Sequence, residues 1–209
     1  MFTAVTLADV EGLGSVTIRR LARALGVEAM SLNHYVASKG EIFDSMVELV
    51  FAEIDHPSEE ADWKQAMLER AVSVRAALKR HPWAISILQS RTSPGPENLG
   101  HLDALIGCCR KAGFSVVMAA HATSLVDSYV YGFVLQEVNL PSPESGGLEA
   151  VIEGVLPNLE RDFPFLAELT IEHVLQPGYQ YADEFDYGIG LILDGLEAAA
   201  RKGLGQPPT

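Results

Sequence analysis

The segment of residues 17–36 constrains the fold more than any other part of the chain, because it has the pattern of two short helices joined by a tight turn. Thr17 can cap the first helix, and Leu21 and Leu25 then fall on one face at helical spacing. Gly26 stands where that helix has to end, since glycine adopts a positive φ at little steric cost. The segment therefore predicts a helix-turn-helix.

The second helix of this segment has an outward face of mostly small or hydrogen-bonding side chains. Val27, Leu32 and Val36 are available for the core. The residues left facing outward are Ala29, Met30, Ser31, Asn33 and His34. Such a face suits the major groove of DNA, where side chains have to approach base edges closely. The pattern predicts that this helix binds DNA.

The charge of the chain is divided unevenly along its length. The 209 residues carry a net charge of −13, which by itself argues against a nucleic-acid partner. Residues 1–40, however, hold four basic and three acidic side chains, so their net charge is +1 and the rest of the chain carries −14. A near-neutral head on an acidic body can bind DNA in one orientation only, because the body repels non-specific contact.

Composition and motifs argue against a membrane protein, a disulfide-stabilised protein and an enzyme. The chain is 48% hydrophobic, yet it has neither an apolar run of transmembrane length nor a basic-then-apolar leader, so we expect a cytoplasmic protein. Cys108 and Cys109 are adjacent, which disfavours a bond between them and predicts ordinary packed or half-exposed helix residues. The six histidines lack metal-ligand spacing, and no P-loop, dinucleotide-binding or nucleophile-elbow pattern is present. We therefore expect no metal, no cofactor and no catalytic site.

Periodicity and turn signals predict an all-α fold, because no segment alternates with period two for long enough to form a strand. Ser38 and Glu41 form a capping box at the start of a helix that ends before Pro57. Loops are expected at residues 140–147 and 176–179. The other expected helices cover residues 2–11, 62–80, 83–90, 97–112, 115–138, 148–155, 163–175 and 183–202.

Several segments resemble a known family. Phe2 to Glu53 resembles the DNA-binding domain of tetracycline-repressor (TetR) family regulators, and the matching segments are Leu7–Leu13, Thr17–Ala22, Leu25–Leu32 and Val36–Lys39. The rest of the chain resembles, more weakly, the ligand-binding and dimerisation domain of the tetracycline-repressor branch. The matching segments are His81–Ala84, Ala112–Ser115, Ser128–Phe133 and Asp194–Leu196. The resemblance covers nearly the whole chain.

The resemblance implies a two-domain architecture and a function. A helix-turn-helix domain would span residues 1–46, a ligand-binding and dimerisation domain residues 47–203, and a disordered tail residues 204–209. The expected function is that of a homodimeric repressor that binds palindromic operator DNA and is released by a small-molecule effector. Two alternatives are a helical ligand-binding protein or enzyme with a vestigial DNA-binding head, and a co-regulator that acts through protein contacts.

The resemblance also assigns residues to DNA. The positions carried over are Thr17, Ile18, Arg19, Ala29, Met30, Ser31, Asn33, His34, Tyr35 and Lys39. Arg19 and Lys39 can neutralise phosphates, while Asn33 can pair with adenine. The order Leu-Asn-His-Tyr at residues 32–35 departs from the family, in which Tyr usually follows the Leu directly, and this leaves open which of the three side chains faces phosphate. The family's basic residues before the first helix are also missing, so reduced affinity is expected.

An effector site is expected in the body. The candidate residues either line a binding pocket or, in the alternative, are ordinary core or interface residues. The candidates are Trp83, Ile87, Arg91, Leu102, Ile106, Met118, His121, Leu125, Ser128 and Tyr131. Four of them are predicted to share one cavity, namely Trp83, Ile87, Met118 and Tyr131. Tetracycline-binding members have a His at the position of Ile87 and a carboxylate at that of Gln136, so tetracycline–Mg²⁺ is not the expected ligand.

The final helix carries an apolar stripe that predicts a dimer interface. Two glycines one heptad apart accompany the stripe and would permit close approach of another helix. The predicted interface consists of Phe185, Gly188, Ile189, Ile192, Gly195 and Leu196. In the alternative, this stripe and the one on the long helix before residue 138 pack within one chain.

Overall fold

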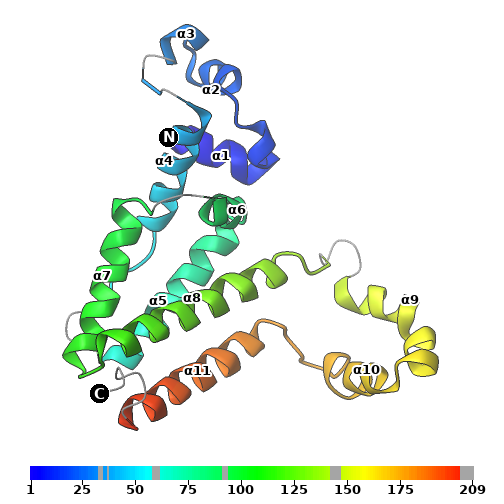
Figure 1. Ribbon diagram of the computed structural model, residues 1–209. Helices are drawn as coiled ribbons and strands as arrows, with labels where there is room; N and C mark the ends of the chain where they lie inside the picture. The colour runs from blue at the N-terminus through cyan, green and yellow to red at the C-terminus, as the bar shows by residue number, and fades with distance from the viewer. Residues whose placement is uncertain (33–34, 37, 58–61, 91–93, 142–146, 203–209) are drawn as a thin grey trace.

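The structure is a computed structural model that describes residues 1–32, 35–36, 38–57, 62–90, 94–141 and 147–202. These residues form helices and turns without any strand, which confirms the predicted all-α fold. A small head stands on a larger helical body, and a separate pair of helices projects from the body (Figure 1).

The head contains three short helices and the start of a fourth. Thr17 caps the second of them, because its hydroxyl oxygen accepts a hydrogen bond from the Arg20 amide at 3.3 Å. Gly26 ends that helix in the left-handed conformation with φ of 67°, as predicted. The elements are α1 (Phe2–Glu11), a 3-10 turn (Leu13–Ser15), α2 (Ile18–Leu25), α3 (Ala29–Leu32) and α4 (Lys39–Phe51).

Helix α4 leads from the head into the body (Figure 1). It starts at Ser38, whose hydroxyl oxygen accepts from the Glu41 amide at 3.2 Å, in agreement with the predicted cap. Its inner face is completely buried at Met46, Val47 and Val50. Because it packs against α1 at one end and against α6 and α7 at the other, α4 belongs to the core of both parts.

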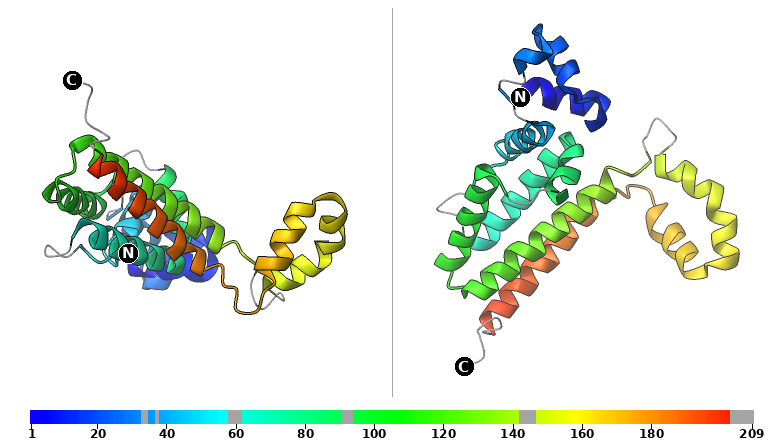
Figure 2. Two further views of the ribbon diagram at one scale, coloured as in Figure 1. Left: turned by 90° about the horizontal axis from the view of Figure 1, so that it is seen from below. Right: turned by 45° about the horizontal axis from the view of Figure 1, so that its top comes forward.

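The body is built around the long helix α8, which lies against α5, α7 and α11. Figure 2 shows α8 and α11 side by side in both of its views. Asp62 and Ser115 cap α5 and α8, each accepting hydrogen bonds from amides of the first turn. The helices are α5 (Trp63–Arg80), α6 (Trp83–Ser90), α7 (Pro96–Lys111), α8 (Val116–Glu137) and α11 (Asp183–Arg201).

The projecting pair consists of α9 (Gly147–Asp162) and α10 (Pro164–Leu169), followed by a π-helical turn (Thr170–Val174). Figures 1 and 2 show that this arm extends away from the rest of the body. The predicted end of the first arm helix at residue 155 is wrong, since α9 continues through Pro157 to Asp162. Most of the predicted loop at 140–147 and the predicted disordered tail lie outside the described residues.

The predicted dimer stripe on α11 has to be corrected. Phe185 and Ile189 are completely buried within one chain, so these two residues have no surface left for a partner. Leu196 is 4% exposed and lines a groove between α8 and α11. Gly188 is half-buried and packs closely on α8, because a Cβ atom there would stand 2.1 Å from the Tyr129 hydroxyl oxygen. The alternative of packing within one chain holds for Phe185 and Ile189. A periodic apolar stripe predicts that a face is buried, but not against which chain.

No helix among the described residues is both long enough and apolar enough to cross a membrane.

Candidate DNA interface and effector site

The helix-turn-helix presents most of its predicted DNA contacts on the surface. Met30 is 75% exposed and Tyr35 is 84% exposed, although both are large and apolar in part. Ile18 and Ala29 are half-buried, and the other exposed positions are Thr17, Arg19, Ser31 and Lys39. Asn33 and His34 lie outside the described residues. The described face of α3 therefore leaves side chains available for base edges.

The arginines of α2 differ in their surroundings. Arg20 forms an ion pair with Glu11 of α1, so part of its charge is used within the head. Arg19 is exposed at the start of the same helix. Lys39 lies over the ring of Phe43, with its Nζ atom 4.9 Å from the ring centroid, which holds the ammonium group at the start of α4. Arg19 and Lys39 thus keep the positions expected of phosphate contacts.

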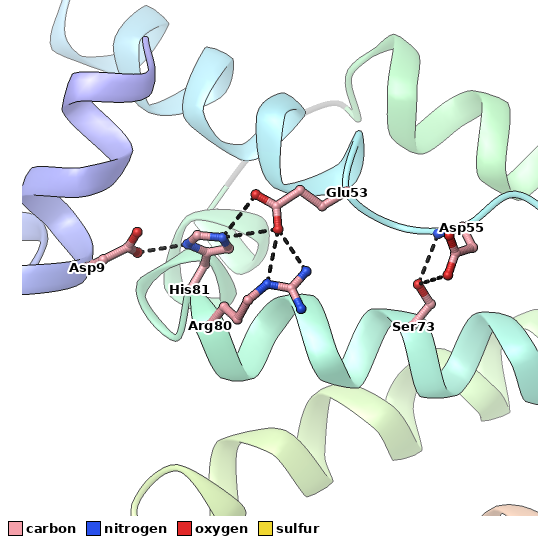
Figure 3. Close-up of polar contacts among 6 residues, drawn as sticks. All are labelled: Asp9, Glu53, Asp55, Ser73, Arg80 and His81. Carbon is pink, nitrogen blue, oxygen red and sulfur yellow. Dashed lines mark hydrogen bonds and ion pairs between the residues drawn. The ribbon is translucent and has the colours of Figure 1, made fainter.

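A hydrogen-bonded junction joins the head to the body (Figure 3). Asp9 of α1 lies 2.8 Å from Nδ1 of His81 and accepts a hydrogen bond from Nε1 of Trp83 at 2.7 Å. Glu53, just after α4, accepts from Arg80 at 2.8 Å and lies 3.2 Å from Nε2 of His81. We call Asp9, Glu53, Arg80, His81 and Trp83 the junction.

The junction shows what Trp83 does in this chain. The residue was predicted to line an effector cavity, but its indole N–H instead binds the head. Two further hydrogen bonds join α5 to the segment that follows α4 (Figure 3). The Asp55 amide donates to the Ser73 hydroxyl at 2.9 Å, and that hydroxyl donates to the Asp55 carboxylate at 3.1 Å. A change in the body at α5 or α6 can therefore reach α1 through direct contacts.

The predicted effector-site residues fall into separate places. One hollow of about 210 Å³ lies between α6, α7 and α8 and contains two of them, Leu102 and Tyr131. Its lining residues are Ile85, Leu88, Gln89, Asn98, Leu102, Asp127 and Tyr131. Of the remaining candidates in the described part of the chain, Ile87 is buried, Ile106 is 38% exposed and Ser128 is exposed. Arg91 lies outside the described residues.

A second hollow, of about 490 Å³, is an open groove between α8 and α11. It contains three predicted effector-site residues, Met118, His121 and Leu125. Three predicted dimer residues line it as well, namely Ile192, Gly195 and Leu196. Neither hollow brings Trp83, Ile87, Met118 and Tyr131 together, and their shared cavity stays a prediction. Met118 and Tyr131 stand thirteen residues apart on one helix, which places them about 20 Å apart along its axis.

A cluster of polar side chains adjoins the first hollow. Arg70 of α5 is 1% exposed, and its Nη1 atom donates to Oδ1 of Asp127 at 2.5 Å. Burial raises the pKa of Tyr131 to about 12, and the nearby Asp127 carboxylate adds to the rise while Arg70 opposes it. Sequence analysis missed Arg70. The signal was present, because Arg70 shares the buried stripe of α5 with Met67 and Val74.

The two cysteines are adjacent residues of α7. Cys109 is buried, and burial raises the pKa of its thiol to about 11, which keeps it protonated at neutral pH. Cys108 is half-buried, so the prediction of ordinary helix residues is confirmed. Among the described residues, no three His, Cys, Asp or Glu side chains gather in a way that could hold a metal ion.

An exposed helix-turn-helix on a helical body that it contacts through a polar junction defines a DNA-binding regulator with a separate sensing domain. Residues 56–200 match the family model described as "Tetracyclin repressor-like, C-terminal domain". The chain belongs to the TetR family of transcriptional regulators.

Three known proteins illustrate the relationship. The HTH-type transcriptional repressor DrrR1 of Streptomyces coeruleorubidus is 32% identical over 98% of this chain and 78% of its own length. A possible TetR family regulator from Streptomyces coelicolor A3(2) has a crystal structure that is similar with a TM-score of 0.71, at 31% identity over 95% of this chain and 97% of that one. ActR of Streptomyces coelicolor, solved in complex with actinorhodin, is similar with a TM-score of 0.80. Its identity to this chain is 26%, over 95% of this chain and 93% of that one.

Proposed function

We propose that this regulator is a cytoplasmic, non-enzymatic repressor that binds a palindromic operator as a homodimer and leaves it when a small molecule binds the body. The exposed side chains of Met30 on α3 and of Tyr35 just after it carry the proposal, because large exposed side chains that are apolar in part are typical of a surface that another molecule covers. Two heads related by a two-fold axis would read two half-sites in successive major grooves. The functional boundary would fall in α4, with residues 1–46 binding DNA and residues 47–203 sensing the effector.

A second copy of the chain is the partner we infer for the exposed face of α8 and α11. Leu125 is 51% exposed, Leu191 is 56% exposed and Tyr187 is 70% exposed, and the groove between the two helices is lined mostly by apolar side chains. Packing the pair against its symmetry copy would cover these residues at once. Ile192, Gly195 and Leu196 of the predicted stripe would take part, since all three line the groove.

The arm supports the same inference. Phe163, Phe165, Leu166 and Leu169 are between 48% and 84% exposed on an arm whose helices pack mainly on each other. So many exposed apolar side chains are typical of a surface that another protein covers.

The junction supplies the allosteric mechanism that we infer. An effector in the hollow would touch α6 through Ile85 and Leu88, and α6 begins at Trp83, which holds Asp9 of the head. An effector that binds the protein more tightly when the head has one particular orientation shifts the population toward that orientation. The distance between the two heads would then no longer match two successive major grooves. The complex of ActR with actinorhodin supports a small organic effector.

Selection from random double-stranded DNA tests the function. We expect a palindrome to be enriched, and Met30→Ala to relax the preference at one base position in each half-site. Enrichment of no sequence by a folded dimer would contradict the proposal and favour the helical ligand-binding protein with a vestigial head.

A further inference from the structure

The N-cap position of α7 is occupied by a glycine. Gly95 has no side chain that could accept a hydrogen bond from the first turn, and Pro96 after it has no amide hydrogen. The first amide inside the helix therefore belongs to Glu97. Because Ser, Thr, Asp or Asn usually supplies the acceptor for such an amide, the start of α7 needs an acceptor from elsewhere in the chain.

Glu48 of α4 supplies that acceptor. Its Oε2 atom accepts a hydrogen bond from the Glu97 amide at 2.8 Å. The partial positive charge at the N-terminus of a helix favours a carboxylate at this place. Helix α7 contacts the last turn of α4 a second time, since Nε2 of His101 lies 3.1 Å from the Phe51 carbonyl oxygen. The end of α4 is thus held by α7 at two places.

The close approach of the carboxylate requires a glycine at residue 95. A Cβ atom there would stand 2.1 Å from Oε1 and 2.5 Å from Oε2 of Glu48, which is closer than non-bonded atoms approach. The φ of Gly95 is −84°, a value that other residues adopt without strain. The glycine is therefore needed for the contact with Glu48 and not for the conformation of the backbone.

We propose that Glu48 is a positioning residue for operator binding: by capping α7 it fixes α4, and with it the head, in the orientation that fits two half-sites. Helix α4 packs against α1 at its other end, so a change in how its last turn is held changes the direction of the head (Figure 1). The contact is separate from the junction, to which α7 contributes none of the five residues. The positioning role rests on the proposed function, whereas the cap can be measured without DNA.

Two substitutions at Gly95 separate the capping of α7 from its connection to α4. Gly95→Ala excludes the Glu48 carboxylate and offers no acceptor in its place. Gly95→Ser excludes the carboxylate too, but its hydroxyl can accept from the amides of the first turn. Hydrogen exchange of the Glu97 amide in the full chain should be about tenfold faster in Gly95→Ala, as expected for one lost hydrogen bond. In Gly95→Ser it should stay near the native rate.

DNA binding tests the positioning role. Both Gly95 variants should bind a palindromic operator about tenfold more weakly than the native chain, because the orientation of the two heads then has to be fixed on binding. Their affinity for an isolated half-site should be native, since a single head contacts it. Loss of the cap alone would instead weaken Gly95→Ala and leave Gly95→Ser unchanged.

Substitutions at Glu48 test the other side of the contact. Glu48→Asp keeps the charge but is one methylene shorter, so it should lose operator affinity as Gly95→Ala does. Glu48→Gln keeps the length and an acceptor oxygen and should retain most of the affinity. The double variant of Glu48→Asp with Gly95→Ala should lose no more than either single variant, since each removes the same contact. Gly107→Ala on the same helix is the control, because its Cβ atom meets open space, and it should bind both DNAs like the native chain.

Four results would overturn the proposal. They are a native exchange rate of the Glu97 amide in Gly95→Ala, native operator affinity of Gly95→Ser, equal losses on the half-site and the palindrome, and additive losses in the double variant. Thermal melting establishes that each variant is folded, and Glu48→Asp decides the matter if a Gly95 variant is not. A native chain that selects no operator contradicts the proposed function, while fast exchange in Gly95→Ala would still establish the contact between Glu48 and α7.

Discussion

Asp9 and His81 connect the head to the body at 2.8 Å, although they are 72 residues apart in the chain. The same Asp9 oxygen accepts from Nε1 of Trp83 at 2.7 Å, so one carboxylate of α1 holds two side chains at the start of α6. Such a contact fixes the orientation of the head relative to the part of the body that would sense the effector.

Replacement of Asp9 by Ala should therefore destabilise the protein and weaken operator binding. The buried N–H groups of His81 and Trp83 lose their acceptor, which costs about 1–3 kcal/mol. The heads also lose their fixed orientation, so DNA binding has to supply the ordering that the junction provided. Urea denaturation and operator titration measure the two effects. Asp103→Ala, at an exposed position on α7, is the control and should change neither.

Close packing of Tyr129 on α11 predicts the effect of a single methyl group. The Tyr129 hydroxyl donates to the carbonyl oxygens of Glu184 and Phe185 at 3.0 and 3.1 Å, and a Cβ atom at Gly188 would stand 2.1 Å from that hydroxyl. Gly188→Ala should lower the free energy of unfolding by about 1–3 kcal/mol. Gly107→Ala has open space on α7 and should raise it by about 0.5–1 kcal/mol through helix propensity. Equal effects of the two substitutions would show that Tyr129 does not require the glycine.

Helix ends were predictable because their signals are local. Thr17 and Ser38 accept hydrogen bonds from amides three residues further on, Gly26 adopts the positive φ that ends α2, and each takes the expected role. The junction was not predictable, since the meeting of Asp9 with His81 depends on how α1 sits on α6. The apolar stripe of α11 was visible, but its periodicity carries no information about whether the covering surface belongs to the same chain.

The residues of the candidate effector site were also predictable only in part. Leu102 and Tyr131 were predicted and do line the hollow, because apolar and aromatic residues on central helices tend to face interior space. Met118 was assigned to the same cavity but lies in the groove beside α11. Arg70 was missed because an arginine within a helix is usually exposed, and only its place on a buried stripe distinguishes it.

Titration of His101 should lower the free energy of unfolding in mild acid. Its folded-state pKa is lowered from the ordinary value of 6.5, chiefly by burial, so the unfolded chain binds a proton more readily. The stability that depends on the neutral ring is complete above about pH 6.5 and is lost as the pH falls through the folded-state pKa. Between pH 6.5 and 5.5 the loss is at most about 1.4 kcal/mol. Urea denaturation across this range should show a smaller loss for His101→Gln, which cannot titrate; equal losses would assign the effect to another group.

Two neighbouring arginines should differ in their contribution to DNA binding. Arg19 is exposed, whereas Arg20 forms an ion pair with Glu11. Arg19→Ala should weaken binding to all sequences alike and reduce the slope of log affinity against log salt by roughly one, because one phosphate contact is lost. Arg20→Ala should leave that slope nearly unchanged. Titrations at several salt concentrations decide between the two, and a larger change for Arg20 would reverse the assignment.

Charges placed two residues apart on different faces of α11 should separate the dimer surface from the core. Leu191 is 56% exposed in the single chain, so Leu191→Asp leaves the fold intact but would bury an unpaired charge in the inferred dimer, which should therefore dissociate. Ile189 is completely buried within the chain, so Ile189→Asp should unfold the subunit instead, with a loss of several kcal/mol. Light scattering and circular dichroism distinguish a folded monomer from an unfolded chain. Asp103→Lys on the exposed surface of α7 is the control and should remain a folded dimer. A folded dimer of Leu191→Asp would place the interface away from α11.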